Sequence, residues 1–232
     1  GDAIYIGARM YDREPRLIRS ALARRDEAVE SDLLELYLDT FHDHLTAFNF
    51  RITPAGAIRD AAIGADGRTD NSWDAVWEAG TRIDSLGWVA EIRIPLSQLR
   101  YNASDDATWG IQLARRVHRK AEVSVFSFTP KSEQQGVFRY GHLEGLGRLA
   151  RQRGLELLPY VSVRSEHLIV DPGNPFRDGS DRFGSAGLDV KVGLTSDLAL
   201  TATMNPDFGQ VEVDPAVVNL TEFETFFEEK RP

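Results

Sequence analysis

Hydrophobic residues at every second position are the feature of this sequence that most restricts its fold. The alternation runs over residues 4–10, 34–38 and 90–94, where Ile, Leu, Ala and Met alternate with polar or small residues. Successive side chains of a β-strand point to opposite faces, so a period of two predicts strands with one buried and one solvated face.

Turn-forming sequences separate these runs and set the fold class. They occur at Thr53–Gly56, Ala65–Gly67, Asn102–Asp105 and Glu133–Gly136. Many short strands at such spacing predict an all-β chain, an antiparallel β-sandwich, over about residues 1–150. Little helix is predicted: a turn or two within Pro15–Arg25 and a single turn at Pro95–Leu99.

The pattern changes after residue 150. Residues 155–163 have the composition of a strand, and residues 171–185 are rich in Gly, Pro, Asp and Ser, which predicts a long loop. Alternation over 188–194 and 198–204 predicts a β-hairpin, and a capping pattern at Asn219 predicts a short helix after it. Strands of a membrane barrel alternate in the same way, so the hairpin fits either a soluble sheet or the start of a barrel.

Charge and composition exclude several functions. With 27 Lys and Arg against 36 Asp and Glu, the net charge of −9 argues against nonspecific nucleic-acid binding. Without cysteine there is no disulfide, thiolate nucleophile or Cys-bound zinc. No catalytic motif is present, so we expect a protein that is not an enzyme, although a two-carboxylate polysaccharide hydrolase stays open. The chain starts without Met, in a strand pattern, which we interpret as a fragment of a longer protein.

The segment from Asp70 to Trp77 is the candidate ligand site. Trp73 and Trp77 lie four residues apart, among Asp70, Asn71 and Asp74. Exposed indole rings stack on the apolar faces of sugars, and the acidic and amide groups bind hydroxyls. The competing interpretation is core packing, since Trp is usually highly buried.

The segment from Asp39 to His44 is the candidate metal site. Asp39 and Asp43 offer carboxylate oxygens of the kind that Ca²⁺ prefers. His42 and His44 share one face of an extended chain, and paired imidazoles bind transition metals. A solvated turn after a strand is the more common interpretation, because the sequence shows no further ligands.

Six stretches of the first part of the chain form a recognisable series: Tyr5–Asp12, Arg24–Asp26, Leu38–Asp43, Thr53–Gly56, Ser72–Trp77 and Gly87–Pro95. This series resembles a family 9 carbohydrate-binding module, and more closely the version fused to an uncharacterised bacterial outer-membrane β-barrel family. The stretches that resemble the start of the barrel are Asn205–Glu212 and Phe226–Pro232.

This resemblance implies a carbohydrate-binding-module-like sandwich on residues 1–150, whose first strands precede Gly1. Residues 151–232 would begin the barrel, which would continue after Pro232. Family 9 modules typically hold a sugar between two aromatic rings and often carry structural calcium. The resemblance therefore implies a non-catalytic domain in the cell envelope that binds a polysaccharide or oligosaccharide, with Trp73 and Trp77 as the candidate ring contacts.

Two alternatives remain at this point. One is a structural or gating domain of an outer-membrane porin or transporter without a sugar site, in which all four Trp residues are buried. The other is the hydrolase fragment. In either case the hairpin at 188–204 leaves an open edge and an apolar face, so we expect self-association of the isolated fragment.

Overall fold

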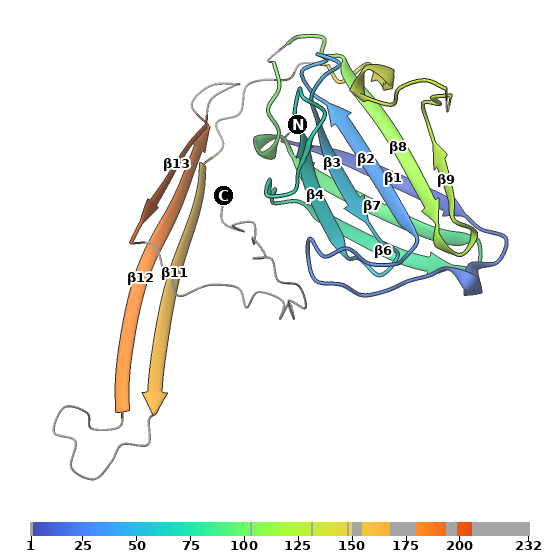
Figure 1. Cartoon of the computed structure of the whole chain (residues 1–232). Coiled ribbons are helices and arrows are strands. Elements are labelled where there is room, and N and C mark those ends of the chain that lie inside the picture. The colour runs from blue at the N-terminus through green and yellow to red at the C-terminus, as the bar shows by residue number, and fades with distance from the viewer. Residues whose placement is uncertain are drawn as a thin grey trace, which may run out of the picture. The chain divides into compact units, whose positions relative to one another are not determined.

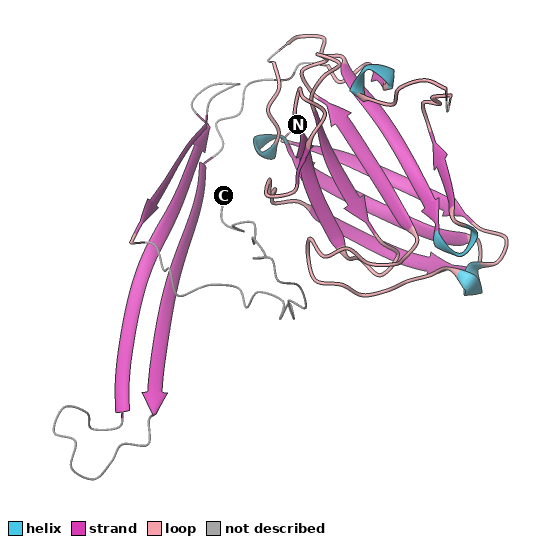
Figure 2. Ribbon diagram, viewed as in Figure 1, coloured by secondary structure: helices cyan, strands magenta, loops and turns pink. Residues whose placement is uncertain are grey.

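The computed structural model describes residues 2–102, 104–130, 132–147, 149, 155–167, 180–193 and 199–205. These residues form two compact units, one comprising the described residues up to 149 and the other those from 155 to 205. In both units the regular secondary structure is mostly β-strand, as Figure 2 shows.

The smaller sheet of the first unit contains the predicted strands at residues 4–10 and 90–94. Its order is β1 (Ala3–Tyr11), β7 (Gly87–Pro95) and β6 (Glu78–Asp84), all antiparallel. The register pairs Ile6 with Ile92. The turn into β7 requires glycine at position 87, because its φ is 140° and a Cβ there would lie 2.0 Å from the carbonyl oxygen of Met10.

The larger sheet packs against the smaller one, as Figure 1 shows. It has seven strands in the order β10-β8-β2-β3-β4-β5, with β9 also paired to β8. The strands are β2 (Leu33–Asp39), β3 (Ala47–Ile52), β4 (Ile58–Ile63), β5 (Thr69–Asp70), β8 (Trp109–Val117), β9 (Glu122–Val125) and β10 (Gly141–Leu143).

The core lies between the two sheets and confirms the antiparallel β-sandwich. Alternate residues of facing strands fill it, including Leu36, Phe50, Trp88, Ile94 and Trp109, each at most 1% exposed. The described helices are single turns of 3-10 helix at Pro15–Leu17, Leu96–Gln98, His118–Lys120 and Val137–Arg139. The second of these is the turn predicted at Pro95–Leu99.

The second unit is a three-stranded antiparallel sheet of β11 (Leu155–His167), β12 (Ser180–Gly193) and β13 (Ala199–Met204). The pairing of Leu188 with Met204 confirms the predicted hairpin. The loop predicted over 171–185 is wrong at its end, because residues 180–185 pair with β11 and extend β12. A thirteen-residue partner strand outweighs the local preference of Gly and Ser for turns. The helix predicted after Asn219 lies outside the described residues.

The register of the second unit gives it one largely apolar face and one face that mixes polar and apolar side chains. Leu157 of β11 pairs with Val190 of β12, which pairs with Ala202 of β13. The next row places Leu158, Asp189 and Thr203 on the opposite face. The apolar face is well exposed in this unit, with Leu155, Leu157, Val161, Val163, Leu200 and Met204 all more than half exposed.

Candidate functional site

The outer face of the larger sheet carries a row of polar side chains on adjacent strands. Tyr37 of β2 pairs with Asn49 of β3 and with Gln112 of β8. One pair further along, Glu35 lies opposite Arg51. The adjacent residues Leu36 and Phe50 face the core. Because side chains alternate along a strand, the polar residues between them face outward.

Arg51 is held in place by two partners on this face. Its Nε donates to Asn49 Oδ1 at 2.6 Å and forms an ion pair with Glu35 Oε1 at 2.9 Å. Asn49 is fully buried, and its amide nitrogen donates to the carbonyl oxygen of Leu36 at 3.2 Å. The guanidinium, the carboxylate and the amide therefore form a preorganised polar network on rigid strands.

Two tyrosine rings lie beside this network. The ring centroids of Tyr37 and Tyr140 are 5.8 Å apart, and the planes are inclined by 54°. Tyr140 comes from the segment just after the helical turn Val137–Arg139. Burial raises the pKa of Tyr37 to about 12, and the Glu35 carboxylate adds to the effect. Burial also raises the pKa of Tyr140, so both hydroxyls stay protonated at neutral pH.

The segment after β9 is fastened to this face through Gln112 of β8. Gln112 donates to the carbonyl oxygen of Ser127 at 2.7 Å and accepts from its N–H at 2.8 Å, which fixes the segment after β9. The flanking Phe126 and Phe128 are 65% and 75% exposed. The face thus combines aromatic rings with planar hydrogen-bonding groups, the pairing that suits a ligand with apolar patches and many hydroxyls.

Asn71, one of the residues of the predicted ligand site, contacts a residue of this face. Its side-chain oxygen accepts from Arg59 Nη2 at 2.8 Å, and Arg59 pairs with Arg51 across β3 and β4. The Nε atom of Arg59 is buried without a partner. Sequence reasoning missed the rest of the face, because its members come from β2, β3 and β8 and the segment before β10.

Trp77 lies in the core instead of offering a ring face. It is 4% exposed, contacts Phe50 edge to face at 5.2 Å, and donates from Nε1 to Asp60 at 3.1 Å. Trp73 is half-buried and lies against Phe48 at 4.7 Å between ring centroids. Both indoles pack around Phe50 and do not form a clamp for a sugar ring.

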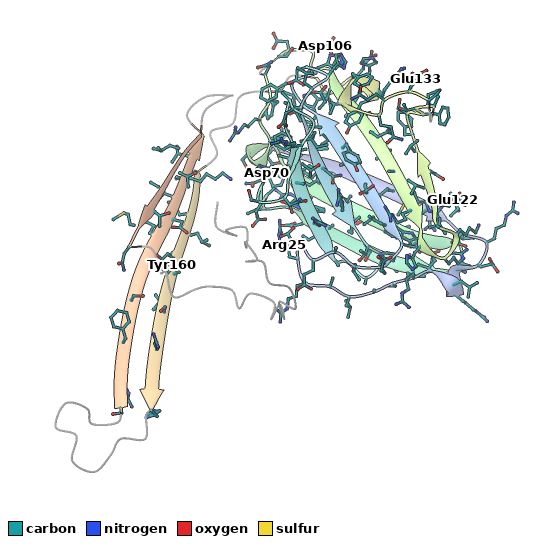
Figure 3. The ribbon with its side chains drawn as sticks, viewed as in Figure 1. Arg25, Asp70, Asp106, Glu122, Glu133 and Tyr160 are labelled. Carbon is teal, nitrogen blue, oxygen red and sulfur yellow. The ribbon has the colours of Figure 1, made fainter. Side chains whose placement is uncertain are left out.

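Asp70 and Asp74 both have partners in the structure. Asp70 accepts from the N–H and the hydroxyl of Ser72, at 2.9 Å and 2.6 Å, which closes a turn. Asp74 forms an ion pair with Arg25 at 2.6 Å. Figure 3 labels Asp70 and Arg25 on this side of the sandwich.

Arg25 occupies the centre of the largest acidic cluster in the described part of the chain. Oxygens of Asp26, Asp60 and Asp74 lie within 4.8 Å of one another, and Arg25 forms ion pairs with all three residues. The guanidinium supplies the positive charge that these carboxylates require.

Asp39 and Asp43, the residues predicted to bind calcium, both accept hydrogen bonds within the loop after β2. The two oxygens of Asp39 accept from the N–H groups of Asp43 and His44 at 3.1 Å and 2.9 Å. Asp43 accepts from the N–H groups of Leu45 and Thr46 and from the Thr46 hydroxyl. These hydrogen bonds shape the loop after β2, and the calcium site stays a prediction.

A β-sandwich with a polar and aromatic outer face is thus the class of domain that the first unit represents. Residues 152–232 match the model of a domain of unknown function (DUF5916). The sequence matches no curated protein. No helix in the described part of the chain has the length and apolarity needed to cross a bilayer.

Two solved structures are similar to the chain at low identity. One is a family 9 carbohydrate-binding module from Caldicellulosiruptor kristjanssonii in complex with cellotriose, and it is 17% identical in sequence. The alignment covers 63% of this chain and 71% of the module, with a TM-score of 0.44. The other is a family 9 module from the same organism in complex with glucose, and it is 18% identical in sequence. That alignment covers 65% of this chain and 74% of the module, with a TM-score of 0.42.

Proposed function

We propose that the sandwich is a non-catalytic glycan-binding domain whose ligand lies on the outer face of the larger sheet. The observation that carries the proposal is the Tyr37–Tyr140 ring pair, 5.8 Å between centroids, beside the fixed Glu35–Arg51–Asn49 network. Tyrosine rings pack on the apolar faces of sugars, and the network supplies both donors and acceptors for hydroxyl groups. Neutral oligosaccharides fit this mixture better than anions do, because the net charge is −9.

Titration calorimetry of the full chain with xylo- and cello-oligosaccharides tests the proposal. Tyr140→Ala removes one ring, and Arg51→Met removes the central donor while keeping its aliphatic stem. We expect both to reduce affinity by at least about tenfold, the loss of one good hydrogen bond or ring contact. Tyr11→Ala is the matched control, because Tyr11 is 66% exposed on the outer face of the smaller sheet. Absence of heat with every sugar, or equal losses in Tyr11→Ala, contradicts the proposal.

We propose that the second unit places the protein at the outer membrane, as the beginning of a β-barrel. Its strands β11 and β12 are thirteen and fourteen residues long, enough for a transmembrane strand of about 9–11 residues. The segregation of an exposed apolar face from a more polar one is the pattern that such strands share. An envelope location is compatible with the absence of cysteine from the chain.

A structural or gating domain without a sugar site is the second candidate. It is favoured by the burial of Trp77, Trp88 and Trp109, each at most 4% exposed. Glycan titration separates the two candidates, since only the first predicts heat that depends on Tyr140 and Arg51.

A further inference from the structure

Three histidines from distant parts of the sequence meet at one end of the larger sheet. His42 and His44 lie in the loop that follows β2, and His142 is the central residue of β10. Gly110 of β8 pairs with both His142 and Asp39, so β8 brings β10 close to the end of β2. The sequence separation of 100 residues between His42 and His142 hides this arrangement from a reading of the sequence.

The rings are in mutual contact. His42 Nε2 lies 2.9 Å from His142 Nδ1. The ring centroid of His42 is 4.6 Å from that of His44 and 5.0 Å from that of His142, and the third separation is 6.2 Å. Nδ1 of His44 is buried and has no hydrogen-bond partner. A buried unpartnered ring nitrogen carries a desolvation cost that a ligand would remove.

The backbone is shaped to hold the rings there. His42 and His44 have φ values of 53° and 60°, a region that non-glycine residues seldom occupy. Asp39 stabilises this loop by accepting the N–H groups of Asp43 and His44. Gly110 leaves room for it, since a Cβ at that position would lie 2.9 Å from Cβ of Asp39. Two costly conformations in one loop point to a role for the side chains that they position.

We propose that His42, His44 and His142 form a binding site for a divalent transition-metal ion. Imidazole nitrogens bind Zn²⁺, Co²⁺, Ni²⁺ and Cu²⁺, and a set without carboxylate or carbonyl ligands disfavours Ca²⁺ and Mg²⁺. The site differs from the calcium site expected at Asp39 and Asp43, because the ligands are ring nitrogens.

The His42–His142 pair already lies near the spacing that a metal ion requires, whereas the His44 ring must reorient before its nitrogen joins them. Two nitrogens on one tetrahedral Zn²⁺ at about 2.0–2.1 Å are about 3.3 Å apart, against 2.9 Å between His42 and His142. The His44 ring has to turn toward that pair to bring in its nitrogen. His142 is exposed and the other two rings are half-buried, so an ion can enter from solvent. Three protein ligands leave a fourth position for water or for an oxygen of a bound molecule.

Metal titration of the full chain without an affinity tag tests the site. We expect one equivalent of Zn²⁺ by calorimetry, and the intense visible absorption of tetrahedral Co²⁺ when cobalt is used. His142→Gln, His42→Gln and His44→Gln each lower the Zn²⁺ affinity by more than about tenfold, since even changes in groups that only orient a ligand cost about 10–100-fold. Ca²⁺ produces no comparable heat.

The remaining two histidines of the chain supply matched controls. His118, which lies 3.3 Å from Glu30 in the turn after β8, and His167 at the end of β11 are outside the cluster. His118→Gln and His167→Gln retain the affinity and the cobalt spectrum. The proposal is overturned if no cobalt band forms, or if His142→Gln binds Zn²⁺ as the unaltered chain does. His142 is exposed, so circular dichroism of His142→Gln should show an intact fold.

Discussion

The indole nitrogen of Trp77 donates a hydrogen bond to a carboxylate oxygen of Asp60, 3.1 Å away and beneath the surface of the sandwich. The other oxygen of Asp60 accepts the N–H of Ala75 at 2.6 Å, and Arg25 pairs with the carboxylate at 2.7 Å. One buried side chain thus joins β4, the Trp77 segment and the loop before β2. This relationship explains why a Trp surrounded by polar residues in the sequence lies in the core.

Replacing this carboxylate tests the relationship. Asp60→Asn leaves Arg25 without its buried partner, and we expect a loss of about 2–3 kcal/mol in the free energy of unfolding. Chemical denaturation measures the loss, and the emission of Trp77 should change with it. Asp74→Asn is the control: its carboxylate is largely exposed, so a loss below about 1 kcal/mol is expected. Equal effects of the two substitutions would assign no special role to Asp60.

The sequence predicted the parts of this fold that depend on local alternation. Residues 4–10, 34–38 and 90–94 form strands, and their Ile and Leu side chains face the core. The same alternation implied an outer face, but it gave no order for the strands. Strand order is a long-range property, and it alone brings Tyr140 to Tyr37 and His142 to His42.

The surroundings of the predicted ligand site depend on strand order for the same reason. Trp73 and Trp77 stand out in the sequence because polar residues flank them. The structure gives those polar residues other partners: Arg25 for Asp74, Ser72 for Asp70 and Arg59 for Asn71. Only the positions of Arg25 and Arg59, distant in sequence, show that the polar groups belong to turns and ion pairs.

Stability at low pH should depend on Asp12. Two hydrogen bonds from Arg119, at 2.7 Å and 2.8 Å, lower the pKa of Asp12 from 3.8 to about 2. A carboxyl with a depressed pKa in the folded state stabilises the fold above its unfolded pKa and loses this contribution as pH falls through the folded pKa. We therefore expect about 2 kcal/mol from Asp12 above pH 4, vanishing as the pH falls through about 2.

Denaturation at a series of pH values, with Asp12→Asn beside the unaltered chain, measures this contribution. The difference in the free energy of unfolding between the two proteins should be constant near neutral pH and should fall to nearly zero at about pH 2 and below. Asp66→Asn, beside the exposed Arg68, serves as control and should change stability little at any pH. A difference that persists undiminished to pH 2 would contradict the assigned pKa.

The Tyr37 hydroxyl should ionise at an unusually high pH. With its pKa raised to about 12 by burial, its phenolate forms about two pH units above the ordinary tyrosine value of about 10. The raised pKa means that the stabilising contribution is complete below pH 10 and is lost as the pH rises through about 12. Ultraviolet titration of Tyr37→Phe against the unaltered chain isolates this ionisation.

Glu35→Gln provides a second check on the cause. The Glu35 carboxylate opposes a second negative charge, so its removal should lower the pKa of Tyr37 while burial still keeps it above 10. A difference curve centred near pH 10 in the unaltered chain would mean that the Tyr37 hydroxyl is solvated, and it would weaken the case for a desolvated binding face.

The apolar face of the second unit should be covered, by lipid or by a second copy of the chain. Leu157, Val161 and Val163 are more than half exposed on β11 and face the same side as Val190. We expect the full chain to associate with phospholipid vesicles in flotation assays, and to self-associate in sedimentation experiments without lipid.

A lysine placed on the apolar face and, in a second variant, on the opposite face distinguishes burial of the apolar face from nonspecific association. Leu157→Lys puts a charge on the apolar face and should weaken vesicle binding by about 2 kcal/mol, or roughly 30-fold. Thr203→Lys puts the same charge on the opposite face, beside Asp189, and should leave binding nearly unchanged.

If lipid is the occupant, Leu157→Lys reduces flotation by this roughly 30-fold loss of affinity. If a second copy is the occupant, the substitution yields monomers, and the unaltered chain does not float with vesicles. Equal behaviour of the two variants in both assays would remove the apolar face from any role in association.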